Sequence, residues 1–478
     1  ISLMKDQVDQ LTTAGVAAAL LNSSLSPEEY QHNVESIKKG RVKLLYLAPE
    51  TLLKANILRL LSSVNVDCFA IDEAHCISSW GHDFRPEYRQ LSDLRNRFPE
   101  AVCIALTATA TSRVRDDIKT SLGMDTSDEF IASLNRENLY IRVIPKKDPV
   151  NQSVEFIKNF PNQSGIIYCF TRRQVDDLYA YLHQLGYSVK PYHAGLTETE
   201  RHRNQEMFIR DDVQIIVATI AFGMGIDKEN IRFILHYDLP QNIESYYQEI
   251  GRAGRDGLRS DCLMLFSYGD LQKIKYIINK KDSHEKRVAN IHLNALLGFA
   301  ETDECRRIPV INYFSETYTR EYCKMCDNCL AGKKTVQDIT VASQKFLSCA
   351  KRTGEIFGAN HIIDVLRGSK AQKVVKFGHQ RLSTYGIGTE YSRRQWVQLS
   401  RQFVSKGLLS QDAEFGGLKL TPKAWAVLKG DQTVKGRIEE NHLPLSRPEL
   451  EELSHKHGLF EVLRKKRKEL ADAAGVTP

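Results

Sequence analysis

Short apolar runs alternate with amphipathic segments over the first 266 residues of the chain. The apolar runs have the length of buried strands, and most segments between them have the 3.6-residue spacing of helices. The strands are predicted at 42–47, 68–71, 101–106, 165–170, 188–192, 214–218, 233–237 and 262–266. Strands interleaved with helices predict parallel sheets and therefore an α/β fold.

The alternating pattern is interrupted near residues 144–151, where Pro145 and Pro149 enclose charged residues, and we expect a hinge between two α/β domains there. Beyond residue 266 the pattern changes. The elements predicted there are helices at 362–366, 396–403 and 423–428 and a hairpin at 408–420 that turns at Gly416 and Gly417. A polar stretch at 431–446 follows, and an amphipathic helix begins near residue 459.

The apolar run at 68–71 leads directly into two adjacent carboxylates, Asp72 and Glu73. Open α/β sheets hold their ligands at the carboxyl ends of their strands. We therefore expect Asp72 to hold Mg²⁺ and Glu73 to polarise the water that attacks a γ-phosphate. The alternative is an ordinary strand end followed by a solvated acidic turn.

A short loop rich in aromatic residues follows these carboxylates. Aromatic rings and a guanidinium beside a nucleotide site are suited to stacking on bases and holding phosphates. The candidate residues are His75, Trp80, Phe84, Arg85 and Tyr88. The alternative is that one or two of the aromatic side chains pack beneath the loop.

The second α/β segment carries two arginines one helical turn apart, Arg252 and Arg255, shortly after Gln248. A guanidinium stays charged and binds oxygens through two hydrogen bonds, so these residues suit a phosphoryl group in transfer. The alternative is a glycine-rich surface turn with solvated arginines. Small residues that follow two of the strands, at 107–109 and 218–228, suit contacts with a phosphate chain or, equally, tight packing.

Four of the ten cysteines are clustered, and they are Cys305, Cys323, Cys326 and Cys329. This C-x₂-C-x₂-C run with one upstream cysteine supplies four thiolates for a tetrahedral Zn²⁺, which would be structural because the protein fills every position. An iron–sulfur cluster and unliganded core thiols are the alternatives. The scatter of the other cysteines argues against a disulfide framework and favours a reducing compartment.

A content of 42% hydrophobic and 26% charged residues is typical of globular proteins, and 478 residues suffice for three or four domains of roughly 100 to 200 residues. No apolar run approaches the roughly 18 residues that a membrane span requires. The net charge of +7 is uneven, because residues 335–430 hold 15 Lys and Arg against 6 Asp and Glu. This local excess predicts a module that binds a polyanion, although a solvated charged surface would have the same composition.

The order of these motifs resembles the motor core of superfamily 2 helicases and, in detail, the RecQ family of DNA helicases over residues 3–270. The matching segments are Leu3-Met4-Lys5-Asp6-Gln7 (motif Ia), Leu47-Ala48-Pro49-Glu50 (motif Ib), Asp72-Glu73-Ala74-His75 (motif II), the aromatic-rich loop 80–88, Thr107-Ala108-Thr109 (motif III), Tyr168-Cys169-Phe170-Thr171-Arg172 (motif IV), 218–228 (motif V) and 248–255 (motif VI). The joint match favours the functional interpretation of each motif.

The resemblance implies roles for individual residues. Asp72 is expected to bind Mg²⁺ and Glu73 to be the catalytic base. Gln248, Arg252 and Arg255 are expected to serve hydrolysis, with both arginines on the phosphates, and Asp227 is expected to lie near the nucleotide. On the DNA side, Arg172 and Thr219 are expected to lie toward the DNA backbone, and His75 with the loop at 80–88 is expected to couple DNA contact to hydrolysis. ATP bound between two lobes would close them, and hydrolysis would reopen them. In this family such cycles move the protein 3′ to 5′ along single-stranded DNA.

Beyond the motor core, the cysteine group resembles the RecQ zinc-binding subdomain and the basic segment resembles the family's winged-helix domain, which grips duplex phosphates. Arg393 and Arg394 are the candidate DNA contacts in this domain. Phe415, at the tip of the hairpin, is a candidate wedge for the first base pair. The helix at 459–471 resembles the opening helix of an HRDC domain.

The predicted architecture is α/β, with two RecA-like parallel-sheet lobes followed by a zinc-binding helical subdomain and a winged-helix domain. The expected divisions are 1–146 for the first lobe without its N-terminal P-loop part, 147–270 for the second lobe, 271–334 for the zinc-binding subdomain, 335–430 for the winged-helix domain, 431–457 for a linker and 458–478 for the start of a truncated HRDC domain.

The sequence G-x-x-x-x-G-K-[ST] does not occur in these residues. We therefore expect the phosphate-binding loop to precede Ile1, the chain to be truncated at both ends, and this stretch by itself not to hydrolyse ATP. One hypothesis is part of an ATP-dependent 3′–5′ DNA helicase of recombination and repair. The other is a DNA-structure-binding module without motor activity. Glu73, Arg252 and Arg255 favour the first hypothesis, because a pure binding protein does not need them.

The helicase hypothesis implies ATP, Mg²⁺ and a structural Zn²⁺ as cofactors and single-stranded and duplex DNA as partners. By family resemblance, a single-strand-binding protein and recombination or repair factors are further expected partners, and no membrane is. The expected location is intracellular, in the cytoplasm or nucleoid of a bacterium or in the nucleus of a eukaryote.

Overall fold

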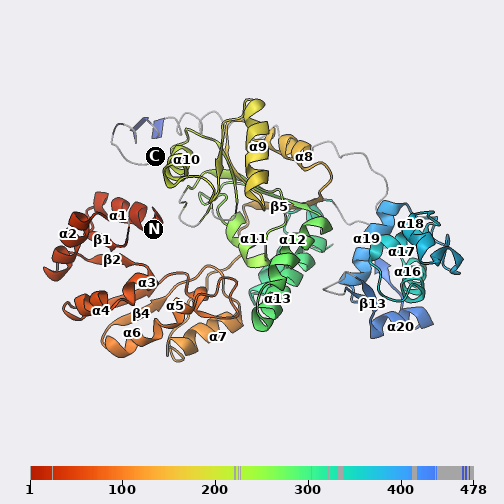
Figure 1. Cartoon of the computed structure of the whole chain (residues 1–478), viewed down its shortest axis with the longest axis horizontal. Helices are drawn as coiled ribbons and strands as arrows, with labels where there is room; N and C mark the ends of the chain where they lie inside the picture. Colours follow the sequence, from red (N-terminus) through yellow and green to blue (C-terminus); the bar gives the residue numbers. More distant parts are fainter. Residues whose placement is uncertain are drawn as a thin grey trace. The chain divides into compact units, whose positions relative to one another are not determined.

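The computed structural model describes residues 2–438, except 24, 220–221, 224–225, 227, 303, 321, 332–336, 412–416 and 437, together with 466–467, 469–470 and 473 (Figure 1). The chain divides into two compact units. Ile1–Phe299 and Cys305–Asp327 make up most of the first unit, and Ala300–Glu304 with the described residues from Asn328 to 438 belong to the second. No helix within these residues is both long enough and apolar enough to cross a membrane.

The N-terminal lobe contains two pairs of parallel strands, β1 with β2 and β3 with β4. Its elements are α1 (Ser2–Thr13), β1 (Ala18–Leu21), α2 (Pro27–Lys38), β2 (Leu44–Leu47), α3 (Pro49–Leu52), α4 (Ala55–Ser62), β3 (Cys68–Ile71), η1 (Ala74–Ile77), α5 (Pro86–Arg89), α6 (Ser92–Arg97), β4 (Val102–Ala105) and α7 (Ser112–Ser121). The strands predicted at 42–47, 68–71 and 101–106 are confirmed as β2, β3 and β4, and β2 and β4 are shorter than predicted. Strand β1 was not predicted, because Ala18-Ala19-Leu20-Leu21 has neither β-branched residues nor alternation.

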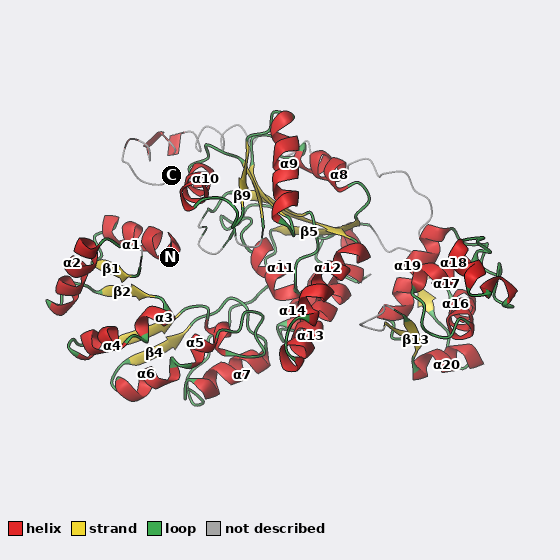
Figure 2. Cartoon of the chain, viewed as in Figure 1, coloured by secondary structure: helices red, strands yellow, loops and turns green. Residues whose placement is uncertain are grey.

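The second lobe is built on a six-stranded, fully parallel sheet with the order β5-β10-β9-β6-β8-β7. Figure 2 shows this sheet in yellow, with β5 and β9 labelled. Its elements are β5 (Leu139–Pro145), α8 (Pro149–Ile157), β6 (Ser164–Tyr168), α9 (Arg172–Gln184), β7 (Val189–Tyr192), α10 (Glu198–Ile209), β8 (Ile215–Ala218), β9 (Ile231–His236), α11 (Ile243–Ile250) and β10 (Ser260–Phe266). Every residue of β6, β8 and β9 is buried, as expected for central parallel strands. The predicted α/β class is thus confirmed.

Strand β5 corrects one detail of the sequence analysis. It pairs with β10 along its whole length, so it belongs to the second sheet although the lobe boundary was placed after residue 146. The strand escaped prediction because Tyr140 and Arg142 interrupt its apolar residues. The expected hinge at 144–151 therefore begins inside a strand of the second lobe. The other domain limits remain predictions.

A helical segment follows the second sheet and contains α12 (Tyr268–Asn279), α13 (Ser283–Glu301), α14 (Arg307–Tyr313) and α15 (Asp327–Leu330). It is fastened to the edge strand β5. The backbone N–H of Ile141 donates to the carbonyl of Met325 (3.1 Å), and the Arg307 guanidinium donates to the carbonyl of Leu139 (2.8 Å). The edge of the sheet is thereby covered, which removes unpaired backbone groups from solvent.

A buried charge cluster fixes α12 to the same sheet. The Lys146 ammonium lies 2.7 Å from Asp238 and 3.0 Å from Asp270, and Lys273 lies 3.1 Å from each of these carboxylates. Burial opposes ionisation of Asp238, but hydrogen bonds and attraction from Lys146, the backbone N–H of Phe170 and Lys273 outweigh it and lower the pKa of Asp238 to about 2. The ionised carboxylate is therefore part of the folded state.

Because the pKa of Asp238 is lower in the folded chain than in the unfolded one, ionisation of Asp238 stabilises the fold above about pH 4, and this contribution disappears as the pH falls toward about 2. We expect Asp238→Asn to lower the thermal midpoint at pH 7 and to flatten its decline between about pH 5 and 2. Circular dichroism melts across this range measure both effects. Asp177→Asn, at an exposed carboxylate, is the control, and a wild-type slope in Asp238→Asn would contradict the prediction.

The second unit folds around Trp396, which is fully buried and donates from Nε1 to the carbonyl of Gly388 (2.6 Å). Its elements are β11 (Gln337–Asp338), α16 (Thr340–Arg352), α17 (Ala359–Leu366), α18 (Gln372–Lys376), η2 (His379–Arg381), α19 (Arg393–Ser405), β12 (Leu409–Gln411), β13 (Leu418–Leu420), α20 (Pro422–Lys429) and β14 (Lys435–Gly436). The hairpin of β12 and β13 and the helices α17, α19 and α20 confirm the predicted winged-helix elements. The tip of the hairpin, with Phe415, lies outside the described residues.

Trp396→Ala removes the largest side chain of this core and leaves a cavity, so we expect it to destabilise the second unit by about 3–5 kcal/mol. Urea unfolding followed by circular dichroism measures the change. Trp425→Ala, at a tryptophan that is 44% exposed, is the matched control and should cost much less. Equal losses in the two variants would contradict the placement of Trp396 at the centre of the core.

Candidate functional site

The two carboxylates lie at the end of β3, in a turn that the backbone holds in a strained conformation. Glu73 has φ +50° and ψ +40°, a left-handed conformation that is uncommon for residues other than glycine. The Asp72 carboxylate accepts the backbone N–H of Glu73 (2.8 Å), and the N–H of Ala74 donates to the carbonyl of Leu106 beyond β4 (2.9 Å). The turn therefore presents both carboxylates at the carboxyl edge of the β3–β4 pair.

His75 sets the electrostatics of Glu73. Its Nδ1 lies 3.2 Å from Glu73 Oε2 and 2.9 Å from the Thr107 hydroxyl. This neighbour lowers the pKa of Glu73 more than partial burial raises it, and Arg252 adds to the lowering. Glu73 is therefore ionised at neutral pH, as a catalytic base must be.

The contacts continue from His75 into the second lobe. The Thr107 hydroxyl accepts the backbone N–H of Thr109 (3.2 Å), and Gln248 donates from Nε2 to the Thr109 hydroxyl (3.1 Å). These contacts form a polar path from Glu73 through His75, Thr107 and Thr109 to Gln248. The path brings together residues that the sequence analysis assigned to motifs II, III and VI.

Arg252 lies against a glycine that leaves room for it. Its guanidinium donates to the carbonyl of Gly223, and a Cβ added at Gly223 would lie 2.4 Å from the guanidinium carbon. Arg252 Nε is buried without a hydrogen-bond partner among the described residues, whereas Glu73 Oε2 has His75 Nδ1 beside it. A cationic donor left open in this way, together with the ionised carboxylate of Glu73, fits a phosphate group and the water that attacks it. Arg255 is exposed in the following turn.

The loop residues are only partly buried, and several already have partners within the protein. The Arg113 guanidinium stacks 3.1 Å from the ring of Trp80, whose other neighbour is His284 on α13 (5.0 Å, edge to face). Arg85 pairs with Asp83 (2.6 Å). Phe84 lies under Arg89, and Tyr88 packs on the core of the first lobe. Packing within the protein thus accounts for part of this loop, as the alternative interpretation anticipated for one or two rings.

The remaining candidates lie apart from this path or outside the described residues. Arg172 is exposed at the start of α9, and Thr219 donates its backbone N–H to the carbonyl of Tyr192 (3.1 Å). Arg393 is exposed and pairs with Asp364 in the second unit. Asp227 and the side chain of Arg394 are outside the described residues. Their roles remain predictions.

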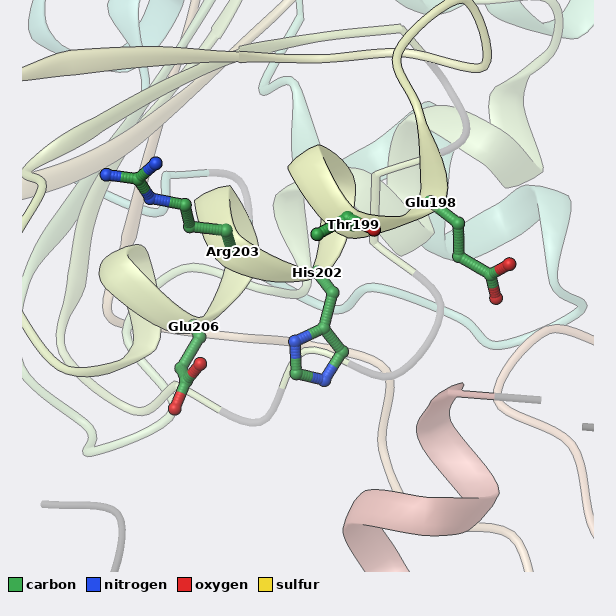
Figure 3. A pocket seen from close by; sticks show the side chains of 5 residues that line it. All are labelled: Glu198, Thr199, His202, Arg203 and Glu206. Atoms are coloured by element: carbon green, nitrogen blue, oxygen red, sulfur yellow. The ribbon is translucent and has the colours of Figure 1, made fainter. Parts of the chain in front are cut away.

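A hollow on the second lobe runs along α10 and was not predicted (Figure 3). It is lined by Glu198, Thr199, His202, Arg203 and Glu206. All five side chains come from successive turns of one helix and are exposed, so the hollow is an open groove and not an enclosed binding site. It shares no residue with the path from Glu73 to Gln248.

The four clustered cysteines meet in space, because their sulfur atoms all lie within 4.8 Å of one another. A Zn²⁺ with Zn–S bonds of about 2.3 Å places its sulfurs about 3.8 Å apart, so this arrangement fits the ion. The cluster is supported by Asp327, whose carboxylate accepts from Arg306 Nε (2.7 Å) and from the backbone N–H of Val143 in β5 (3.0 Å). Cys305, Cys323, Cys326 and Cys329 would hold the metal.

Comparison with known proteins assigns most of the chain to known families. Four family models match, namely DEAD/DEAH box helicase over 1–118, helicase conserved C-terminal domain over 148–257, RecQ zinc-binding over 268–330 and RQC domain over 333–444. The ATP-dependent DNA helicase RecQ of Pasteurella multocida is 40% identical over all of this chain and 76% of its own length. The helicases of the same name from Haemophilus influenzae and Bacillus subtilis are 41% and 38% identical, again over all of this chain and over 78% and 80% of their own lengths.

The chain belongs to the RecQ family of ATP-dependent DNA helicases. The RecQ zinc-binding match spans all four clustered cysteines, so it resolves the choice between zinc, an iron–sulfur cluster and free thiols in favour of zinc. The helicase matches account for the two α/β lobes, and the RQC match accounts for the winged-helix unit. The RecQ assignment confirms the resemblance on which the sequence interpretation rests.

Two RecQ residues near the site were missed by the sequence analysis. His82 stacks on His75, with ring centroids 4.5 Å apart, and Glu244 on α11 lies 3.1 Å from His82. His82 stood in the aromatic-rich loop and was overlooked beside larger rings. Glu244 has no signal in the sequence, because its partners are distant along the chain.

Cys326 is fully buried within the cysteine cluster, so we expect Cys326→Ser to lose most of the bound zinc and to destabilise the region around 305–330. Structural Zn²⁺ contributes about 10–16 kcal/mol of binding free energy in zinc-finger peptides, so its loss is costly. Elemental mass spectrometry of the purified protein measures the zinc content. Cys68→Ser, at an exposed cysteine outside the cluster, is the control. An unchanged zinc content in Cys326→Ser would refute the site.

Proposed function

We propose that this chain forms the motor core and DNA-binding part of a helicase that steps 3′ to 5′ along single-stranded DNA and unwinds duplex DNA in recombination and repair. The observation that carries the proposal is the polar path from Glu73 to Gln248. It joins a candidate catalytic base in one lobe to the arginine-bearing motif of the other. A change in the spacing of the lobes would therefore alter the surroundings of Glu73 directly.

The catalytic roles follow from charge and position. When bound, ATP with Mg²⁺ would supply the phosphoanhydride bond that is cleaved and a positive charge that offsets the charge of the phosphates. Asp72, exposed beside Glu73, would bind the metal, and ionised Glu73 would orient the attacking water and accept its proton. Arg252 would donate its open Nε–H to phosphate oxygens and stabilise the charge that develops there, with Arg255 beside it.

DNA contact is proposed for two regions. The loop at 80–88 is linked to the nucleotide side because His82 stacks on His75, so displacement of the loop by single-stranded DNA would reach Glu73 through one intervening ring. The winged-helix unit, with its local excess of Lys and Arg, would hold the duplex by its phosphates. A single-strand-binding protein and repair factors are proposed protein partners by family alone.

The alternative is a DNA-structure-binding module that does not hydrolyse ATP. The buried Arg252 Nε, which has no hydrogen-bond partner among the described residues, supports the helicase instead, because leaving such a group open costs about 1–3 kcal/mol and serves no purpose in a passive binder.

Glu73→Gln removes the proton acceptor and keeps the size of the side chain. In a full-length RecQ protein that contains these residues and a P-loop, we expect ATP binding to persist and DNA-stimulated turnover to fall by several orders of magnitude, as for loss of a catalytic base that also orients the water. Steady-state hydrolysis and binding of a fluorescent ATP analogue measure the two effects. Glu100→Gln, at an exposed position, is the control, and near-normal turnover in Glu73→Gln would overturn the assignment.

A further inference from the structure

Glu244 is one of the most deeply buried charged groups among the described residues, and three other elements converge on it. Its side chain is 1% exposed and comes from α11, the helix that leads into motif VI. Oε1 accepts from the Tyr313 hydroxyl on α14 (3.0 Å), and Oε2 lies 3.6 Å from His292 on α13. Oε2 also lies 3.1 Å from Nδ1 of His82, in the aromatic-rich loop of the first lobe.

The contact with His82 is the exceptional one, because it crosses from one lobe to the other. Nδ1 of His82 and Oε2 of Glu244 are both buried, and neither has a hydrogen bond to any other described group. His82 Nδ1 therefore depends on Glu244 for compensation of its lost hydration, while Glu244 Oε2 is compensated by His82 at 3.1 Å and by His292 at 3.6 Å. Nearby, Trp80 meets His284 of α13 edge to face.

We infer that Glu244 is a positioning residue that anchors the aromatic-rich loop to α11, α13 and α14 and thereby sets the position of His82 against His75. The inference rests on the proposed function and deepens it. Glu244 does not touch the carboxylates or the arginines of the candidate nucleotide site. It acts on Glu73 through two stacked rings, since His82 lies on His75 and His75 lies 3.2 Å from Glu73.

The anchor explains how the loop can report DNA to the hydrolytic site. A ligand that moves Trp80 must also move His82, since the two are separated by one residue, and must then separate His82 from a buried carboxylate. In this arrangement the carboxylate sets how much DNA contact is needed to release the loop. Weakening it should change the response to DNA and leave DNA-independent hydrolysis largely as it was.

The test compares two buried Glu–His pairs on one helix in the full-length protein. Glu244→Gln keeps an acceptor for Tyr313 but removes the charge that faces His82 and, at a longer distance, His292. We expect the ratio of DNA-stimulated to DNA-independent ATP hydrolysis to fall about tenfold, with DNA-independent hydrolysis changed by no more than about twofold. Glu249→Gln is the matched control, because buried Glu249 bonds His236 within the second lobe (2.7 Å) and does not touch the loop. An unchanged ratio in Glu244→Gln, or an equal fall in Glu249→Gln, would overturn the inference.

A double-mutant cycle with His82→Gln separates anchoring from general damage. If Glu244 acts through His82, the two substitutions together should lower the ratio no further than one alone. Additive losses would contradict the anchor. The cycle also detects a variant that is merely unstable, because instability in one lobe would add to the loss in the other.

Quenching of Trp80 fluorescence by acrylamide tests the anchor without ATP. The fluorescence of Trp80 is obtained by subtracting the fluorescence of the Trp80→Phe variant from that of the protein with Trp80. We expect Glu244→Gln to make the Trp80 fluorescence markedly more quenchable, and Glu249→Gln to leave it unchanged. An unchanged Trp80 signal in Glu244→Gln would refute the anchor even in an active helicase. If the wild-type protein shows no DNA-stimulated hydrolysis, the proposed function fails, and the quenching result still decides the anchor.

Discussion

The position of one imidazole nitrogen governs the candidate hydrolytic site. Nδ1 of His75 faces both Glu73 and Thr107, but it carries at most one hydrogen and cannot donate fully to both. A hydrogen bond to Thr107 completes the polar path to Gln248, whereas a hydrogen bond to Glu73 compensates the carboxylate for its lost hydration. The left-handed turn at Glu73 creates this choice, because it places the carboxylate beside the ring instead of along the strand.

Burial makes the choice energetically significant. His75 is 2% exposed and the side chain of His82 is 9% exposed, so contacts between them act in a medium of lower polarity than water. Arg252 Nε is held in the same way, against a glycine that admits no side chain. Open polar atoms in a protein interior cost stability, and this site carries them where phosphate and water are expected. The cost is consistent with a site that is completed only by its ligand.

Much of the fold could be predicted from the sequence, because the central strands of the second sheet are continuous apolar runs. Strand β5, which was not predicted, is not a continuous apolar run of this kind, because Tyr140 and Arg142 stand between its apolar residues. In the site, Asp72, Glu73 and Arg252 were recognisable because each stands at a fixed place in a local motif. Glu244 could not be recognised, because a single glutamate near the start of a helix is common. The role of Glu244 depends on its contacts with His82 and Tyr313, which are far away in the sequence.

The zinc centre and the loop anchor are structurally connected. Helix α14 carries Tyr313 and lies between Cys305 and Cys323, so the metal would fix both ends of the segment that supplies a hydroxyl to Glu244. Arg307, at the start of α14, is bound in turn to the carbonyl groups before and within β5. The zinc would therefore do more than stabilise a peripheral subdomain. It would hold rigid the surface on which the aromatic-rich loop rests, and a loop can report DNA binding only against a support that does not move with it.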